Sequence, residues 1–136
     1  MQIENEIAAE EYNYLTDSVG WGIKNIDFIE NAMRLSTFKK CIKESGKTIA
    51  MGRAIGDGMT YIIADVVVDP RYQGNGYGRI IMNELLMEIK NRLPKGESCS
   101  ISLISTGGKE SFYEKCGFKK VPYDYNGYGM KMKFVN

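Results

Sequence analysis

The spacing of apolar residues changes near residue 36, and this change separates the first two predicted helices from the first predicted strands. In the first part an apolar residue recurs every three or four positions, which predicts a helix that contains Ala8, Tyr12, Leu15 and Val19. Asp27 and Glu30 stand three residues apart, as in a capping box, and predict that a second short helix begins there. Over residues 37–68 the pattern becomes that of β-strands.

Three segments with β-strand character follow, at 37–43, 47–56 and 59–68. Short turns join them, at 44–46 and at Asp57-Gly58, so we expect an antiparallel meander. The third strand is apolar on both faces, and simple alternation assigns one face to Ile62, Ala64, Val66 and Val68 and the other to Tyr61, Ile63 and Val67. We therefore expect this strand to be central and covered on both sides.

The later segments predict a helix at 76–91, a strand at 98–104, a short helix at 109–115 that ends at Gly117, and two last strands at 118–121 and 127–134. A strand–helix–strand crossover makes 98–104 parallel to 59–68. The predicted fold class is α+β, with a mixed central sheet that combines an antiparallel meander with a parallel pair, and helices on both faces. No linker or repeat divides the sequence, so we expect a single domain over residues 1–136.

The charge balance and the missing residue types narrow the chemistry. Eighteen basic residues against seventeen acidic ones give a net charge of +1, so no nucleic-acid or membrane partner is expected. No apolar run approaches the ~20 residues of a membrane span. The absence of histidine excludes Ser-His and Cys-His catalysis and any histidine metal site. The three scattered cysteines suggest neither a disulfide framework nor a zinc site, so we expect a cytoplasmic protein without a metal.

A glycine-rich loop, Gln73-Gly74-Asn75-Gly76-Tyr77-Gly78, joins the third strand to the next helix. Glycines leave the backbone bare, and the first N–H groups of a helix together with its dipole attract an anion. The loop therefore predicts a pyrophosphate-binding site, the alternative being a tight turn that binds no ligand. It lacks the lysine and serine or threonine of a nucleotide P-loop, and its glycines do not have the dinucleotide spacing Gly-x-Gly-x-x-Gly.

Gln73-x-x-Gly76-x-Gly78 resembles the Gln/Arg-x-x-Gly-x-Gly/Ala loop of the GNAT superfamily of N-acetyltransferases. Two other segments are similar to patterns of that family, namely Val68-Asp69-Pro70 and Phe112-Tyr113-Glu114-Lys115-Cys116-Gly117-Phe118. The order of the predicted elements agrees over about residues 1–134, so the resemblance covers nearly the whole chain. The segments around Trp21 and Gly129 resemble a small bacterial subgroup.

The resemblance implies acetyl-coenzyme A as co-substrate. In that family the loop holds the pyrophosphate and the central strand pairs with the pantetheine arm, and a bulge in that strand would free backbone groups for the pairing and for an oxyanion. Arg71 and Arg79 flank the loop, and Arg79 is the better candidate because it lies in the first turn of the helix. The implied cofactor-binding residues are Val66, Val67, Val68, Gln73, Gly74, Asn75, Gly76, Tyr77, Gly78 and Arg79.

Four further residues each have two interpretations. Tyr113 is either a packed aromatic or, by resemblance, the general acid that protonates the leaving thiolate, since a phenol is protonated at neutral pH. Asp65 lies in an apolar strand and needs a partner, which is either Arg53 or an amine substrate that it binds or deprotonates. Trp21 is either a core residue or a wall of the acceptor pocket. Tyr125 lies in an aromatic-rich segment that is either a surface loop or part of the substrate site.

These residues together imply an acyltransferase that moves an acetyl group from acetyl-coenzyme A to a primary amine, by direct attack of the amine on the thioester. The expected acceptor is a small molecule, and the chain is compatible with a homodimer. Two alternatives remain, a coenzyme A-binding sensor without transfer activity and a protein or peptide N-acetyltransferase. The presence of Tyr113 favours the enzyme over the sensor.

Overall fold

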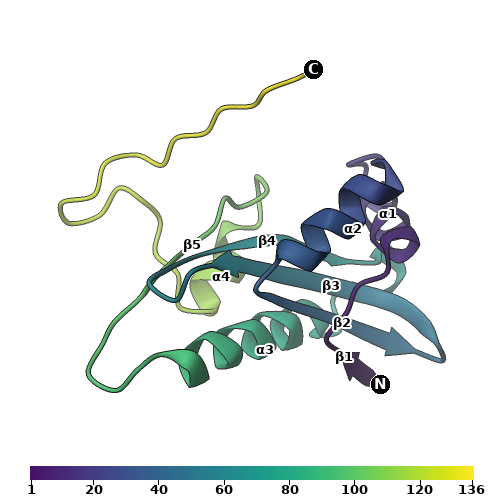
Figure 1. Cartoon of the computed structure of the whole chain (residues 1–136), viewed down its shortest axis with the longest axis horizontal. Coiled ribbons are helices and arrows are strands. Elements are labelled where there is room, and N and C mark those ends of the chain that lie inside the picture. Colours follow the sequence, from purple (N-terminus) through teal and green to yellow (C-terminus); the bar gives the residue numbers. More distant parts are fainter. The chain divides into compact units, whose positions relative to one another are not determined.

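The computed structural model describes residues 1–136, which form two compact units, Met1–Leu103 and Ile104–Asn136. The first unit holds a five-stranded sheet in the order β1-β2-β3-β4-β5 (Figure 1). The strands are β1 (Gln2–Glu4), β2 (Phe38–Glu44), β3 (Lys47–Gly56), β4 (Thr60–Val68) and β5 (Ser100–Ser102). β1 to β4 pair antiparallel and β4 pairs parallel with β5, which confirms the predicted mixed sheet. The edge strand β1 was not predicted, and β5 is shorter than predicted.

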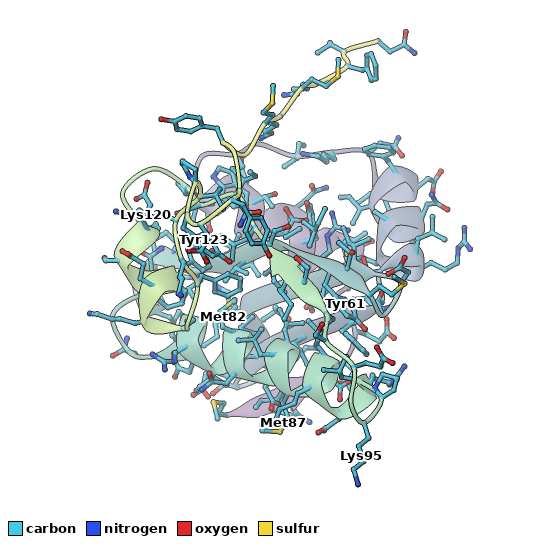
Figure 2. The ribbon with its side chains drawn as sticks, turned by 90° about the vertical axis from the view of Figure 1, so that its left-hand side faces the viewer. Tyr61, Met82, Met87, Lys95, Lys120 and Tyr123 are labelled. Carbon is cyan, nitrogen blue, oxygen red and sulfur yellow. The ribbon has the colours of Figure 1, made fainter.

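Three helices cover the two faces of this sheet (Figure 1). Helices α1 (Ala9–Ser18) and α2 (Ile26–Leu35) lie on one face, and α3 (Tyr77–Arg92) lies on the other. Met82 of α3 is buried against the sheet, whereas Met87 on the same helix is exposed (Figure 2). No helix has both the length and the apolar character needed to cross a membrane.

The second helix begins earlier than predicted. The side chain of Asn25 accepts a 3.1 Å hydrogen bond from the backbone N–H of Phe28 and caps α2. The predicted capping box of Asp27 and Glu30 is therefore wrong, because the N-cap is Asn25 and Asp27 already lies inside the first turn of the helix.

A bulge in β4 changes which side chains share a face. Ala54 of β3 pairs with Ile63, but Met51 pairs with Val67, so two residues of β4 lie opposite Gly52 alone. Asp65, one of these two, has a φ of 56°. The bulge places two consecutive side chains on the same side and thereby reverses the alternation beyond it.

The predicted assignment of the β4 faces is therefore wrong beyond the bulge. Val67 packs in the core cluster of α1 and α2, together with Tyr12 and Met51. Val66 instead lies toward α3, because its side chain and that of Ile81 both surround the position that a Cβ at Gly52 would take. The prediction that β4 is covered on both sides along its length also fails, since the Ile62 side chain is 50% exposed.

The second unit contains one helix, α4 (Glu110–Lys115). Gly117, with a φ of 104°, ends it as predicted, and its N–H donates to the Glu114 carbonyl. The predicted strands at 118–121 and 127–134 are absent, because a strand needs a hydrogen-bonded neighbour and this stretch has none. That the whole chain is one domain stays a prediction.

Candidate functional site

The edge of β4 that faces away from β3 is open along its second half. β5 pairs with β4 over Thr60–Ile62 only, and beyond that point no strand of the first unit continues the sheet. The bulge falls within this open part, as the resemblance implied for Val66, Val67 and Val68. Unpaired backbone N–H and C=O groups on such an edge can bind an extended ligand as an added strand would.

The segment after β4 turns twice before α3 begins. Pro70–Tyr72 form the short 3-10 helix η1, and the side-chain amide of Gln73 then donates a 2.9 Å hydrogen bond back to the Val68 carbonyl. The Asn75 amide donates to the carbonyls of Tyr72 and Gln73, so the loop is held by its own side chains. The loop conformation is thus fixed before any ligand binds.

Two of the three glycines of this loop are required by its backbone. Gly74 has a φ of 81° and Gly76 a φ of 88°, the left-handed region in which a side chain is strained. No heavy atom lies within 4 Å of the place where a Cβ would stand at either residue, so the space beside them is open. A large anion can therefore approach the backbone here.

The N-terminus of α3 directs backbone N–H donors toward the open space beside Gly74 and Gly76. Gly76 is the N-cap, and the first helical hydrogen bond runs from the Ile80 N–H to the Gly76 carbonyl at 3.1 Å. The N–H groups of Tyr77, Gly78 and Arg79 have no partner within the helix, and the helix dipole adds positive potential. Arg79 is exposed in this first turn. The arrangement suits a pyrophosphate.

Asp65 is held at the bulge by two donors. Its Oδ2 accepts a hydrogen bond from the Tyr12 hydroxyl at 2.9 Å and from Arg53 Nε at 2.7 Å. The Arg53 guanidinium also donates to the Ser36 hydroxyl at 3.2 Å. Burial and then the charge of Asp65 raise the pKa of Tyr12, so this phenol remains a donor. The predicted ion pair with Arg53 is confirmed, and both contacts use only one of the two carboxylate oxygens.

Trp21 lies between Gly20 and Gly22, whose φ values are 84° and 78°. The Trp21 N–H donates to the Thr16 carbonyl at 2.9 Å, and the Thr16 hydroxyl donates to the Gly22 carbonyl at 2.8 Å. The backbone is therefore fixed, yet the indole is 44% exposed. The interpretation of Trp21 as a core residue is wrong, and a role as a pocket wall stays a prediction.

Tyr113 and Tyr125 belong to the second unit. The Tyr113 ring packs edge-on against Phe112, with centroids 5.0 Å apart, and against Phe118 at 6.3 Å. Burial, and to a smaller extent Cys116, raise the pKa of the Tyr113 phenol, so it is protonated at neutral pH. Tyr125 is 96% exposed. The catalytic role of Tyr113 and the substrate contact of Tyr125 stay predictions.

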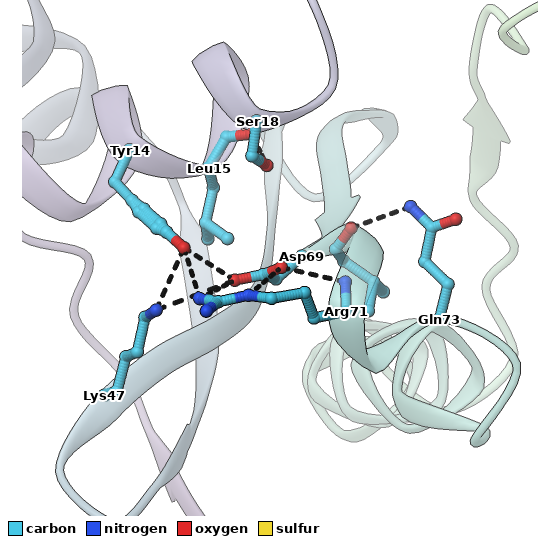
Figure 3. A network of polar contacts seen from close by, with 8 residues as sticks. Tyr14, Leu15, Ser18, Lys47, Asp69, Arg71 and Gln73 are labelled. Carbon is cyan, nitrogen blue, oxygen red and sulfur yellow. Dashed lines mark hydrogen bonds and ion pairs between the residues drawn. The ribbon is translucent and has the colours of Figure 1, made fainter.

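A polar cluster at the end of β4 was missed at the sequence level (Figure 3). Asp69 is buried there and contacts Tyr14 of α1, Lys47 of β3 and Arg71 of η1. Arg71, considered as a phosphate contact, is instead bonded to Asp69. The pattern Asp69-Pro70 after an apolar strand was a signal, because aspartate before proline commonly caps a helix. The chain contains no group of three or more histidine, cysteine, aspartate or glutamate side chains that could hold a metal ion.

Comparison with known proteins identifies similar chains. Residues 39–120 match the family model of the acetyltransferase (GNAT) domain. An uncharacterized N-acetyltransferase from Pyropia yezoensis is 30% identical over 122 residues, which are 86% of this chain and 68% of that protein. A probable acetyltransferase from meticillin-resistant Staphylococcus aureus has a similar crystal structure, with a TM-score of 0.85, 30% identity and 98% of each chain covered. The crystal structure of an aminoglycoside 6'-N-acetyltransferase complexed with coenzyme A shares the fold, with a TM-score of 0.73, 17% identity, and coverage of 94% of this chain and 91% of that one.

Proposed function

Because the chain belongs to the GNAT acetyltransferase family and is an acyltransferase, we propose that it transfers the acetyl group of acetyl-coenzyme A to the primary amine of a small molecule in the cytoplasm. GNAT acetyltransferases use acetyl-coenzyme A and amine acceptors. The observation that best supports the proposal is that three features follow one another directly in the structure. They are the open, bulged edge of β4, the glycine-rich loop and the N-terminus of α3.

The residues present fit this co-substrate. The open backbone at Gly74 and Gly76 and the N–H groups of the first turn of α3 suit the pyrophosphate, with Arg79 as the nearby cation. The unpaired edge of β4 around Val66–Val68 suits the amide groups of the pantetheine arm. When bound, acetyl-coenzyme A supplies the activated acetyl group.

The proposed reaction is a direct transfer. The neutral amine nitrogen attacks the thioester carbonyl carbon, and backbone N–H groups near the bulge stabilise the oxyanion. The carbon–sulfur bond then breaks, and the Tyr113 hydroxyl gives its proton to the departing sulfur. The nitrogen loses a proton to water, the phenolate regains one from solvent, and the products are an acetamide and free coenzyme A.

The acceptor is proposed to bind on the α1–α2 side of β4, because Asp65 has its partners there. Both of those partners bond to Oδ2, which leaves Oδ1 free to accept a hydrogen bond from the neutral amine N–H of the acceptor. Trp21, whose backbone is held by hydrogen bonds and which is 44% exposed, would contact the remainder of the acceptor, as would Tyr125. An acceptor with a compact amine and an apolar portion fits these residue types best.

The test is a thiol-release assay with acetyl-coenzyme A and a panel of primary amines, amino acids and peptides, combined with calorimetric measurement of coenzyme A binding. We expect coenzyme A binding and turnover on one or more small amines. Turnover on peptides alone would instead support the protein N-acetyltransferase. Coenzyme A binding without turnover on any acceptor would support the sensor.

We also propose a homodimer. The C-terminal segment 127–135 is exposed and carries apolar side chains at alternate positions, Tyr128, Met130, Met132 and Phe134. An exposed run of this kind is a typical protein–protein contact. Light scattering on the full chain should give twice the mass of one chain, and Met130→Lys with Met132→Lys should give the monomer. A monomeric wild type would contradict this proposal.

A further inference from the structure

Asp69 is a buried carboxylate at the junction between the open edge of β4 and the glycine-rich loop. Its side chain is only 2% exposed, and it receives bonds from three separate elements (Figure 3). Its Oδ2 accepts from the Tyr14 hydroxyl of α1 at 2.9 Å and from Arg71 Nη2 at 3.2 Å. The ammonium group of Lys47, at the start of β3, lies 4.0 Å from the same oxygen.

The Tyr14 hydroxyl is the second centre of this cluster. It donates to Asp69 and accepts from Lys47 Nζ at 2.9 Å and from Arg71 Nη2 at 2.6 Å. A phenol has one donor and two acceptor positions, so all of its hydrogen-bonding capacity is used. The Lys47 ammonium also lies 4.5 Å from the centroid of the Tyr14 ring. A hydroxyl satisfied in this way holds one conformation.

The cluster sets the direction in which the chain leaves β4. The Asp69 N–H donates to the Ile49 carbonyl at 2.8 Å, which anchors the residue to β3. Its Oδ1 accepts from the backbone N–H of Arg71 at 3.0 Å and caps η1, the turn directly before the glycine loop. One carboxylate therefore fixes the end of the strand and the start of the loop at once.

We propose that Asp69, Tyr14 and Arg71 are positioning residues for the coenzyme, which hold the glycine loop in register with the open edge of β4 so that one ligand can bind both. This inference rests on the proposed function. Arg71 then acts by binding Asp69 and Tyr14, and Arg79 is left as the cation for the pyrophosphate. The strand edge would bind the pantetheine arm and the helix N-terminus the pyrophosphate of the same molecule. If these two sites shift relative to each other, the affinity for coenzyme A falls, whereas the affinity for a ligand that contacts only one of them does not.

The test compares long and short ligands. Tyr14→Phe and Arg71→Gln should each raise the Kd of coenzyme A and the KM of acetyl-coenzyme A by about tenfold, because each variant removes hydrogen bonds to charged groups from the cluster. The kcat at saturating acetyl-coenzyme A should remain within about twofold of wild type, because positioning acts on binding. S-acetylpantetheine lacks the nucleotide and the pyrophosphate, so its KM should not change.

A matched variant separates positioning from general loss of structure. Arg34→Gln, which removes an exposed arginine of α2, should change none of these constants. In a double-mutant cycle, Tyr14→Phe and Arg71→Gln should be non-additive, whereas Tyr14→Phe and Arg79→Gln should be additive.

The inference would be overturned if the KM of acetyl-coenzyme A and the KM of S-acetylpantetheine rose equally in the Tyr14→Phe and Arg71→Gln variants. It would also be overturned if the Kd of coenzyme A and the KM of acetyl-coenzyme A were unchanged in both variants. Failure of the proposed function is a separate result. A wild-type chain that binds coenzyme A without turnover contradicts the transferase, while the Kd values still decide the positioning role. A wild-type chain that binds no coenzyme A contradicts both.

Discussion

The hydroxyl of Tyr12 donates a 2.9 Å hydrogen bond to Oδ2 of Asp65 and so joins α1 to the bulge of β4. Asp65 has a φ of 56°, a conformation that costs a residue other than glycine roughly 1–2 kcal/mol. The contact with Tyr12 and the ion pair with Arg53 offset this strain. The same helix bonds to Asp69 through Tyr14, so both ends of the open segment of β4 are attached to α1.

Asp65→Asn tests whether the carboxylate also serves the acceptor. The amide keeps the shape and the contact with Tyr12 but removes the charge. We expect the KM for amines to rise by about tenfold, because a hydrogen bond to a charged group is lost, while the Kd of coenzyme A stays the same. Asp27→Asn, on the exposed surface of α2, is the control. A lower free energy of unfolding with unchanged amine KM would leave Asp65 with a structural role alone.

Gly76→Val tests the phosphate loop. A branched side chain is strained at a φ of 88° and would occupy the open space beside the loop, so stabilisation of the fold by acetyl-coenzyme A should disappear. The measurement is the Tm with and without acetyl-coenzyme A. Gly58→Val is matched, since Gly58 has a φ of 101° and open space but lies in the turn before β4. That variant should lose stability and keep the Tm increase, and an equal loss of the increase in both would refute the assignment of the loop.

The elements that the sequence predicted well are those whose pattern is local. The regular spacing of apolar residues was enough to predict α1, α3 and the three-stranded meander. The glycines followed by a helical pattern were enough to predict the loop. The resemblance implied a bulge in this strand, but the place where the faces reverse could not be predicted, because it depends on which two residues lie opposite Gly52. The Tyr14–Asp69 bond joins residues 55 positions apart, a separation at which no periodicity carries information. Alternation alone predicted strands at 118–121 and 127–134, but alternation does not supply a partner strand.

The ionisation of Asp69 should also make the free energy of unfolding depend on pH. Burial raises the pKa of its carboxyl, but hydrogen bonds from Arg71 and Tyr14 outweigh this effect and lower the pKa below its ordinary value. In the unfolded chain the group ionises near pH ~3.9. Because the folded pKa is the lower one, the stabilisation is complete above the unfolded pKa and is lost as the pH falls through the folded pKa.

Urea denaturation of wild type and Asp69→Asn at a series of pH values measures this contribution. The difference in free energy of unfolding should be constant above about pH 5 and should shrink as the pH falls below about 4. All other carboxyls are common to both chains, so their titration cancels in the difference. A difference that does not change with pH would show that the charge of Asp69 contributes nothing to stability.

Tyr113→Phe tests the general acid. The variant loses only the hydroxyl, so the ring contacts with Phe112 and Phe118 and the binding of coenzyme A should be retained. General acid catalysis contributes ~10²–10⁴-fold, and a thiolate whose conjugate acid has a pKa of ~8.5 leaves tolerably without help. We therefore expect kcat to fall by about 10²-fold, measured by thiol release at saturating acceptor.

The identity of the leaving thiol provides the decisive comparison for Tyr113. An acetyl thioester of a more acidic thiol needs less protonation, so the loss of kcat in Tyr113→Phe should shrink with that donor. A residue that only packs would give the same loss with both donors. Tyr128→Phe, which removes an exposed hydroxyl of the same unit, should have wild-type kcat with either donor. If Tyr113→Phe also has wild-type kcat while chemistry limits the rate, water and not Tyr113 protonates the sulfur.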